Sequence, residues 1–244
     1  MKKPGMIVFD YGHTLLYEPG YDFLSGERAL FPYIKGNKRG LTPEYVNSFA
    51  QELFGKLSAV REIGFEIHEW QFQKLLYEYL EIEFSIDYPE AEKIFWDSVS
   101  YGDIMPRSDM MIDYINANGI RSGVISNIGF SGAALTERIN RLLPRNRFEF
   151  IIASSEYALR KPNPMLFELA LKKADLCVDE VWFCGDNVKA DVEGAASVGI
   201  FPVWYEDLTC ENPWRKGIEY AVTPVCSHLH VNDWTQMIEM LETL

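Results

Sequence analysis

The sequence predicts an α/β fold: a doubly wound parallel sheet with an inserted all-helical domain. Three observations lead to this prediction. Short apolar runs recur along the chain and end in polar loop residues, amphipathic helical patterns separate most of these runs, and one long stretch near the N-terminus contains helical patterns alone. Strands that alternate with helices are typical of parallel sheets covered on both faces.

The strand candidates are short, mostly apolar runs, the first of them apolar throughout. They span residues 6–9, 122–127, 148–152, 181–186 and 200–204. Such runs fit strands in a parallel sheet, where helices bury both faces. Between the second and third runs, Leu135, Ile139 and Leu142 share one face of a predicted helix.

Residues 17–105 follow a different pattern. Thr42 and Pro43 begin a predicted helix, since threonine is a good N-cap and proline fits the first helical position. Apolar stripes at helical spacing then continue as far as Val99. We therefore assign residues 1–16 and 106–244 to a core domain. Residues 17–105 are assigned to a helical domain inserted after the first strand, over the functional face of the sheet.

Composition and charge narrow the class of protein. The chain has 244 residues, 48% of them hydrophobic, and a formal net charge of -13. A field of that sign repels nucleic acids and anionic membranes, so we expect neither as a partner. No run is long and apolar enough to suggest a membrane span. We expect a soluble cytoplasmic protein, and the sequence leaves its oligomeric state open.

Polar side chains stand where the predicted strands end. Asp10, Ser126 and Asp186 each occupy such a position. Ligands of open α/β sheets bind beyond the carboxyl ends of the strands, so we expect these side chains to meet at one edge. Taken singly, each is explained as well by a turn or cap, and Lys161 by a solvated loop charge. Their ordered combination favours a functional site.

Four short motifs carry a resemblance to the haloacid dehalogenase (HAD) superfamily. Residues 9–15 (FDYGHTL) resemble its first motif, normally Asp-x-Asp-x-Thr after an apolar strand, and residues 124–127 (VISN) resemble the second. Residues 160–164 (RKPNP) are similar to the third, and residues 183–187 (FCGDN) with Asp191 to the fourth. The insert is similar to the cap domain of one large HAD subgroup. The resemblance implies a Rossmann-like core.

The resemblance also implies a magnesium-dependent phosphatase that acts on a phosphorylated small molecule. Asp10 would be the nucleophile and would form a phospho-aspartate. Mg²⁺ would be held by the carboxylates of Asp10 and Asp186 and by the backbone carbonyl of Gly12, all hard oxygen ligands. Asp191 would orient this metal shell or join it as a further ligand.

Residues of the second and third motifs would bind the transferred phosphoryl group. Ser126 and Lys161 would complete the catalytic set with Asp10, the serine by hydrogen bonding and the lysine by its positive charge. The resemblance implies that these two residues also bind the substrate, together with Thr14 and Asn127.

One position departs from the family pattern. Gly12 stands where HAD phosphatases have a second aspartate, which protonates the leaving oxygen and later activates water. Three explanations stay open: a leaving group that needs little protonation, a substitute donor such as His13, an insert residue or ordered water, or vestigial catalysis. Haloacid dehalogenases also lack this aspartate, so hydrolysis of a carbon–halogen bond is an alternative, although the retained Asp186 favours a metal and hence phosphate. A non-catalytic phosphate-binding or sensor protein is a further alternative.

Overall fold

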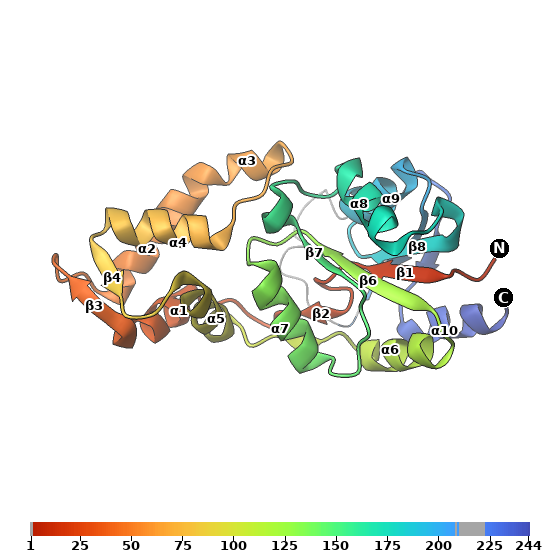
Figure 1. Cartoon of the computed structure of the whole chain (residues 1–244), viewed down its shortest axis with the longest axis horizontal. Helices are drawn as coiled ribbons and strands as arrows, with labels where there is room; N and C mark the ends of the chain where they lie inside the picture. Colours follow the sequence, from red (N-terminus) through yellow and green to blue (C-terminus); the bar gives the residue numbers. More distant parts are fainter. Residues whose placement is uncertain (1, 208, 210–222) are drawn as a thin grey trace.

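The computed structural model describes residues 2–207, 209 and 223–244, which form two lobes (Figure 1). One lobe contains a six-stranded sheet of order β10-β9-β8-β1-β6-β7 in which all neighbouring strands are parallel. The strands are β1 (Met6–Phe9), β6 (Arg121–Ser126), β7 (Ile151–Ala153), β8 (Val181–Gly185), β9 (Phe201–Tyr205) and β10 (Leu229–Val231). The predicted parallel α/β fold is confirmed.

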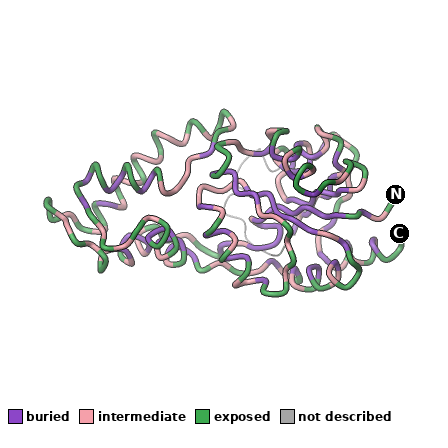
Figure 2. Tube along the Cα trace, in the orientation of Figure 1, coloured by how far each residue is buried: buried purple, intermediate pink, exposed green. Residues whose placement is uncertain are grey.

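Helices cover both faces of this sheet. Successive residues of β1 point to opposite faces, so alternate side chains contact different helices. Ile7 and Phe9 pack with α6 (Ser108–Ala117), α7 (Gly132–Leu142) and α10 (Trp234–Glu242). Met6 and Val8 pack with α8 (Pro164–Ala174) and α9 (Gly194–Ser197). The strands are consequently the most deeply buried part of this lobe, as the tube in Figure 2 shows.

Residues 17–105 form most of the second lobe. Its helices are α1 (Phe23–Leu30), α2 (Pro43–Leu57), α3 (Ala59–Glu62), α4 (Glu69–Tyr79) and α5 (Tyr88–Val99). Thr42 caps α2 as predicted, since its hydroxyl accepts a hydrogen bond from the Tyr45 N–H at 3.3 Å. A separate hydrophobic cluster built around buried residues such as Leu76 and Phe95 fills the space between these helices.

The expectation of an insert made only of helices needs one correction. β3 (Ile34–Asn37) and β4 (Ile82–Phe84) pair as a short antiparallel sheet within it. The two strands are short, and their sequences, IKGN and IEF, include polar residues. Neither therefore shows the mostly apolar run by which the core strands were predicted. A second short pair, β2 (Leu16–Tyr17) and β5 (Asp103–Ile104), joins the insert to the sheet lobe.

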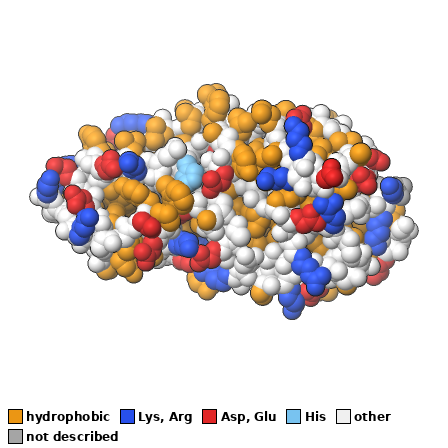
Figure 3. Space-filling model, in the orientation of Figure 1, with side chains coloured by type: hydrophobic (Ala, Val, Ile, Leu, Met, Phe, Trp, Pro, Cys, Tyr) orange, Lys and Arg blue, Asp and Glu red, His pale blue; other side chains and the backbone are white. Residues whose placement is uncertain are grey.

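Charged side chains of both signs lie on the surface of the protein (Figure 3). On the face shown in Figure 3, acidic and basic side chains are interspersed with hydrophobic ones over both lobes. No helix among the described residues is long and apolar enough to cross a membrane.

Candidate active site

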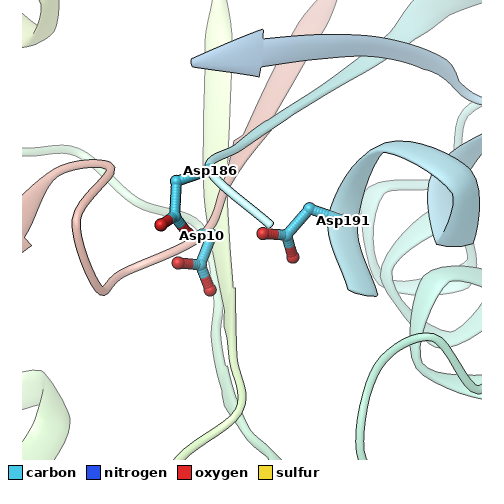
Figure 4. Close-up of side chains that lie close together, drawn as sticks. All are labelled: Asp10, Asp186 and Asp191. Atoms are coloured by element: carbon cyan, nitrogen blue, oxygen red, sulfur yellow. The ribbon is translucent and has the colours of Figure 1, made fainter. Parts of the chain in front are cut away.

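Three aspartates lie together beyond the carboxyl ends of β1 and β8 (Figure 4). Asp10 follows β1, Asp186 follows β8, and Asp191 belongs to η4 (Val188–Glu193), a π-helical turn. One carboxylate oxygen from each lies within 4.8 Å of the others. Such single π-helical turns are frequent at functional sites. The sheet thus brings together Asp10 and Asp186, two of the side chains that the sequence placed at strand ends.

Lys161 contacts two of these three aspartates. Its Nζ is 2.5 Å from Asp10 Oδ1 and 2.7 Å from Asp191 Oδ1. The same ammonium donates a hydrogen bond to the Ile125 carbonyl of β6 at 2.8 Å. The side chain is almost wholly buried. Its place among two carboxylates and a carbonyl excludes the explanation of Lys161 as a solvated loop charge.

The backbone of Lys161 is held by the amide of Asn127. Asn127 Oδ1 accepts a hydrogen bond from the Lys161 N–H at 2.7 Å, and Asn127 Nδ2 donates to the Lys161 carbonyl at 2.9 Å. Both polar groups of this side chain are therefore engaged with the neighbouring loop. In this structure the Asn127 side chain joins the loop after β6 to the loop that carries Lys161.

Gly185 makes room for Asp191, a role that sequence reasoning did not find. A Cβ at Gly185 would lie 2.4 Å from the Asp191 carboxylate carbon, so any side chain there would displace the aspartate. Asp191 Oδ2 also accepts a hydrogen bond from the Asn187 N–H at 3.0 Å. The available signal was the glycine directly before Asp186. Trp204 was missed as well, and its indole N–H donates to the Asp186 carbonyl at 3.3 Å.

Burial and charge act in opposite directions at the site. Burial raises the pKa of Asp10 to about 6, and the charge of Asp191 adds to this, while Lys161 acts to lower it. Burial by itself would lower the pKa of Lys161, but the carboxylates of Asp10 and Asp191 outweigh it and raise that pKa. Lys161 therefore stays cationic at neutral pH. When ionised, three carboxylates and one ammonium leave an excess of negative charge that suits a divalent cation.

The other predicted residues are placed as follows. Ser126 ends β6 and is buried. Thr14 is fully buried, and its Oγ1 has no hydrogen-bond partner within the described part of the chain. A Cβ added at Gly12 would meet no heavy atom within 4 Å. The side chain of His13 is buried, and its backbone has a left-handed conformation with φ 53°. Its ring centroid lies 6.2 Å from that of Tyr17.

Comparisons with known proteins bear on the family and fold of the chain. A model of the haloacid dehalogenase-like hydrolase family matches residues 70–204. The chain is 23% identical to a glyceraldehyde 3-phosphate phosphatase of Pyrococcus furiosus, over 99% of this chain and 95% of that protein.

Solved structures share the fold at low identity. A HAD phosphatase of Thermococcus onnurineus aligns with a TM-score of 0.60 and 16% identity, over 97% of both chains. A 2-haloacid dehalogenase of Pseudomonas syringae pv. Tomato DC3000 aligns with a TM-score of 0.61 and 20% identity, over 98% of both. Because proteins named for two different reactions share the fold, these likenesses do not choose between the reactions. The family model covers more than half of the sequence, and this chain belongs to the haloacid dehalogenase-like hydrolases.

Proposed function

We propose that this hydrolase is a magnesium-dependent phosphatase that acts on a phosphorylated small molecule through a phospho-aspartate at Asp10. One observation carries the proposal: Lys161 contacts both Asp10 and Asp191, inside a cluster of three carboxylates that includes Asp186. The lysine supplies positive charge for a phosphoryl group, and the carboxylates supply oxygen ligands for Mg²⁺. Asp10 and Asp186 would hold the ion with the Gly12 carbonyl, and Asp191 would orient or complete that shell.

In the first step, a carboxylate oxygen of Asp10 attacks phosphorus in line with the bond to the leaving group. That bond breaks with its electron pair, and the leaving oxygen takes a proton from a donor or from solvent. Water then attacks the phosphorus of the phospho-aspartate, which releases inorganic phosphate and restores the Asp10 carboxylate. Mg²⁺, when bound, offsets the negative charge of the phosphoryl oxygens.

The remaining residues would serve the transferred group. Ser126, at the end of β6, would hydrogen-bond a phosphoryl oxygen, and Lys161 would neutralise its charge. For Asn127 we propose a positioning role, since its amide already holds the Lys161 backbone from both sides. Thr14 is fully buried in this structure, so contact with a substrate would require movement of its loop.

Phosphate is favoured over a halogenated acid for two reasons. The three clustered carboxylates suit a cation, whereas displacement of halide needs none. The full-length relative in the comparison is named for glyceraldehyde 3-phosphate, which makes this compound the first alkyl phosphate to test. We further propose that residues 17–105 are the cap domain, because their helices share a hydrophobic cluster of their own. Cytoplasmic location and the lack of nucleic-acid partners stay predictions.

The test measures the release of inorganic phosphate and of halide by the same protein preparation. We expect inorganic phosphate to be released from an aryl phosphate only with Mg²⁺ present, and release to stop with a chelator or in Asp10→Asn. Halide release from a 2-haloacid in the presence of the chelator would instead favour the dehalogenase alternative. Binding of inorganic phosphate with Mg²⁺, but no turnover of aryl phosphate, acyl phosphate or glyceraldehyde 3-phosphate, would favour the phosphate-binding or sensor alternative.

A further inference from the structure

One contact between the insert and the sheet lobe is made by the segment that leads from α3 to the first residue of α4. We call residues 64–69 the insert strap. The Arg160 N–H donates to the Gly64 carbonyl at 2.9 Å, and the Glu66 N–H donates to the Ala158 carbonyl at 3.0 Å. Phe65 and Leu159 form an antiparallel bridge between these two bonds. The strap thus pairs, like a short strand, with the residues that lead directly to Lys161.

A second contact of the strap reaches the loop after β6. The Glu69 N–H donates to the Gly129 carbonyl at 2.9 Å. A Cβ at Gly129 would lie 3.0 Å from the Ile67 carbonyl oxygen, so the absence of a side chain there permits the close approach. Ser126 and Asn127 belong to the start of the same loop region. The strap is therefore seated against both loops that carry residues of the proposed site.

Glu66 is the charged centre of this contact. Its side chain is 1% exposed, and its Oε1 lies 3.0 Å from Arg61 Nε of the insert. Its Oε2 pairs with Arg160 of the sheet lobe and accepts a hydrogen bond from the Ser154 hydroxyl at 2.8 Å. Removing one partner of a buried, hydrogen-bonded ion pair is strongly unfavourable, so these groups are expected to stay together while the strap is seated.

The partners of Glu66 lead to the two site loops by short routes. Arg160 is joined to Lys161 by a peptide bond, and the Lys161 backbone is held on its other side by Asn127. The Ser154 hydroxyl accepts a hydrogen bond from the Ile128 N–H at 2.9 Å, one residue beyond Asn127. One carboxylate from the insert is therefore connected to both sides of the Asn127–Lys161 contact.

We propose that Glu66 is a positioning residue of this enzyme: by binding Arg160 and Ser154 it couples the seating of the insert to the placement of Lys161 and of the loop that begins at Asn127. The inference rests on the proposed function, in which Lys161 faces the phosphoryl group. Glu66 touches no reacting atom in this scheme. Its loss lowers the rate of the chemical step because Lys161 is held less well relative to Asp10.

Two substitutions disturb the contact by different means. Glu66→Gln keeps the size of the side chain and an oxygen for Ser154, but it removes the charge that the two arginines share. Gly129→Ala alters no charge and presses on the Ile67 carbonyl. Glu44→Gln is the matched control, because it removes an exposed carboxylate of the insert that pairs with Arg28. Arg160→Gln, alone and combined with Glu66→Gln, tests whether the effect passes through Arg160.

The first readout is steady-state kinetics with an aryl phosphate and Mg²⁺. We expect Glu66→Gln and Gly129→Ala each to lower kcat by roughly 10-fold or more, with a smaller change in KM, since small misplacements of catalytic groups have effects of this size. The double variant with Arg160→Gln should lose little beyond the larger single loss. Glu44→Gln should match the wild type. An unchanged kcat in Glu66→Gln, or losses that multiply fully in the double variant, would overturn the proposal.

The second readout does not depend on activity. Amide hydrogen exchange should become faster in Glu66→Gln for peptides covering residues 126–131 and 158–163, and stay unchanged for peptides of β1 and α10. Uniform acceleration over the whole chain would indicate a general loss of stability and would count against a positioning role, as would no change in the two loops. If the wild type hydrolyses no phosphate ester, the proposed function fails, while exchange still decides whether Glu66 orders these loops.

Discussion

Buried carboxylates occur in two environments in this molecule: beside a cation, as for Asp10, Asp191 and Glu66, or without one. In the sheet lobe, Asp10 and Asp191 lie 2.5 and 2.7 Å from the ammonium of Lys161. In the insert, Glu27 is 2% exposed and accepts a hydrogen bond from the Tyr77 hydroxyl at 3.0 Å, and no ion pair to it occurs within the described residues. Burial raises the pKa of Glu27 to about 7.

The difference separates two chemical uses of a carboxyl group. A nearby cation lowers the pKa of a carboxyl group and so favours the charged form, which can serve as a nucleophile or metal ligand. A carboxyl group without one takes up a proton near neutral pH and becomes a hydrogen-bond donor. Burial, with the nearby carboxylate of Glu92, raises the pKa of Glu69 to about 8, so the insert contains at least two such groups.

The largest effect is expected at the proposed nucleophile. Asp10→Asn should lower kcat for an aryl phosphate by roughly 1,000-fold or more, because the amide cannot form the phospho-aspartate. Thermal unfolding should show that the variant still folds, since Lys161 keeps its contact with Asp191. Asp179→Asn, which alters an exposed aspartate, is the matched control and should leave kcat unchanged. Retained turnover in Asp10→Asn would contradict the covalent mechanism.

Removing the cation should leave Asp10 and Asp191 without an ammonium partner, as Glu27 is within the described part of the chain. Lys161→Ala leaves Asp10 and Asp191 buried without their partner, which should lower the free energy of unfolding by about 3–5 kcal/mol at neutral pH without added metal. Turnover should fall as well. Urea unfolding with and without Mg²⁺ measures the effect, and Mg²⁺ should restore part of the stability. Lys172→Ala, at an exposed position, is the control. Equal stability of the two variants would show that Lys161 does not compensate these charges.

The insert should show the opposite behaviour when a carboxyl group is replaced. The folded-state pKa of Glu27 is about 7, above its unfolded value of 4.5, so the folded protein binds the extra proton between these values. Wild-type stability therefore falls as pH rises through this window and levels off above it. Glu27→Gln should be nearly neutral at pH 4 and more stable than wild type by about 3 kcal/mol at pH 8.

The measurement is the free energy of unfolding at a series of pH values for Glu27→Gln and wild type. The glutamine oxygen can still accept the hydrogen bond from Tyr77, so packing should be conserved. Glu62→Gln, at an exposed site of the same lobe, should give no comparable gain at pH 8. A difference between Glu27→Gln and wild type that does not vary with pH would mean that Glu27 is charged in the folded protein.

A smaller effect is expected at Gly185, where the lack of a side chain leaves room for the Asp191 carboxylate. Gly185→Ala should displace Asp191, whose carboxylate occupies the position of the new methyl group. We expect the affinity for Mg²⁺, measured by calorimetry, to fall roughly 10- to 100-fold, the range seen when groups that orient metal ligands are lost. Gly55→Ala is the control, because a Cβ there meets nothing within 4 Å. Unchanged affinity would remove Asp191 from the proposed metal shell.

The sequence predicted what depends on strand ends and missed what depends on packing between loops. Asp10, Ser126 and Asp186 could be placed together because parallel strands deliver their carboxyl ends to one edge. The clearance that Gly185 gives to Asp191 depends on how the turn after β8 packs back on the strand. The seating of Glu66 on Arg160 joins segments distant in sequence, for which periodicity carries no signal. For the same reason the pairing of β3 with β4 was not predicted.

Gly12 has no side chain that could donate a proton to the leaving oxygen. If no group replaces it, protonation of the leaving oxygen limits the rate, and the dependence of kcat on leaving-group pKa should be steep across a series of aryl and alkyl phosphates. Gly12→Asp should then raise turnover of alkyl phosphates by roughly 10-fold, below the full range of general acid catalysis because the new group is not optimised. The structure permits this test, since a Cβ at Gly12 meets no atom within 4 Å and φ of Gly12 lies outside the left-handed range.

A flat dependence on leaving-group pKa in the wild type would instead mean that a donor is already present. His13→Ala separates the two kinds of candidate, because His13 lies one residue beyond Gly12 in the sheet lobe. If the profile becomes steep in His13→Ala, the imidazole is the donor. If it stays flat, an insert residue or ordered water is the donor, and Glu69→Gln becomes the next variant, since burial and the Glu92 carboxylate raise the pKa of Glu69 to about 8. Loss of the flat profile in Glu69→Gln would give one protonated carboxyl group of the insert a catalytic role beside the charged carboxylates of the sheet lobe.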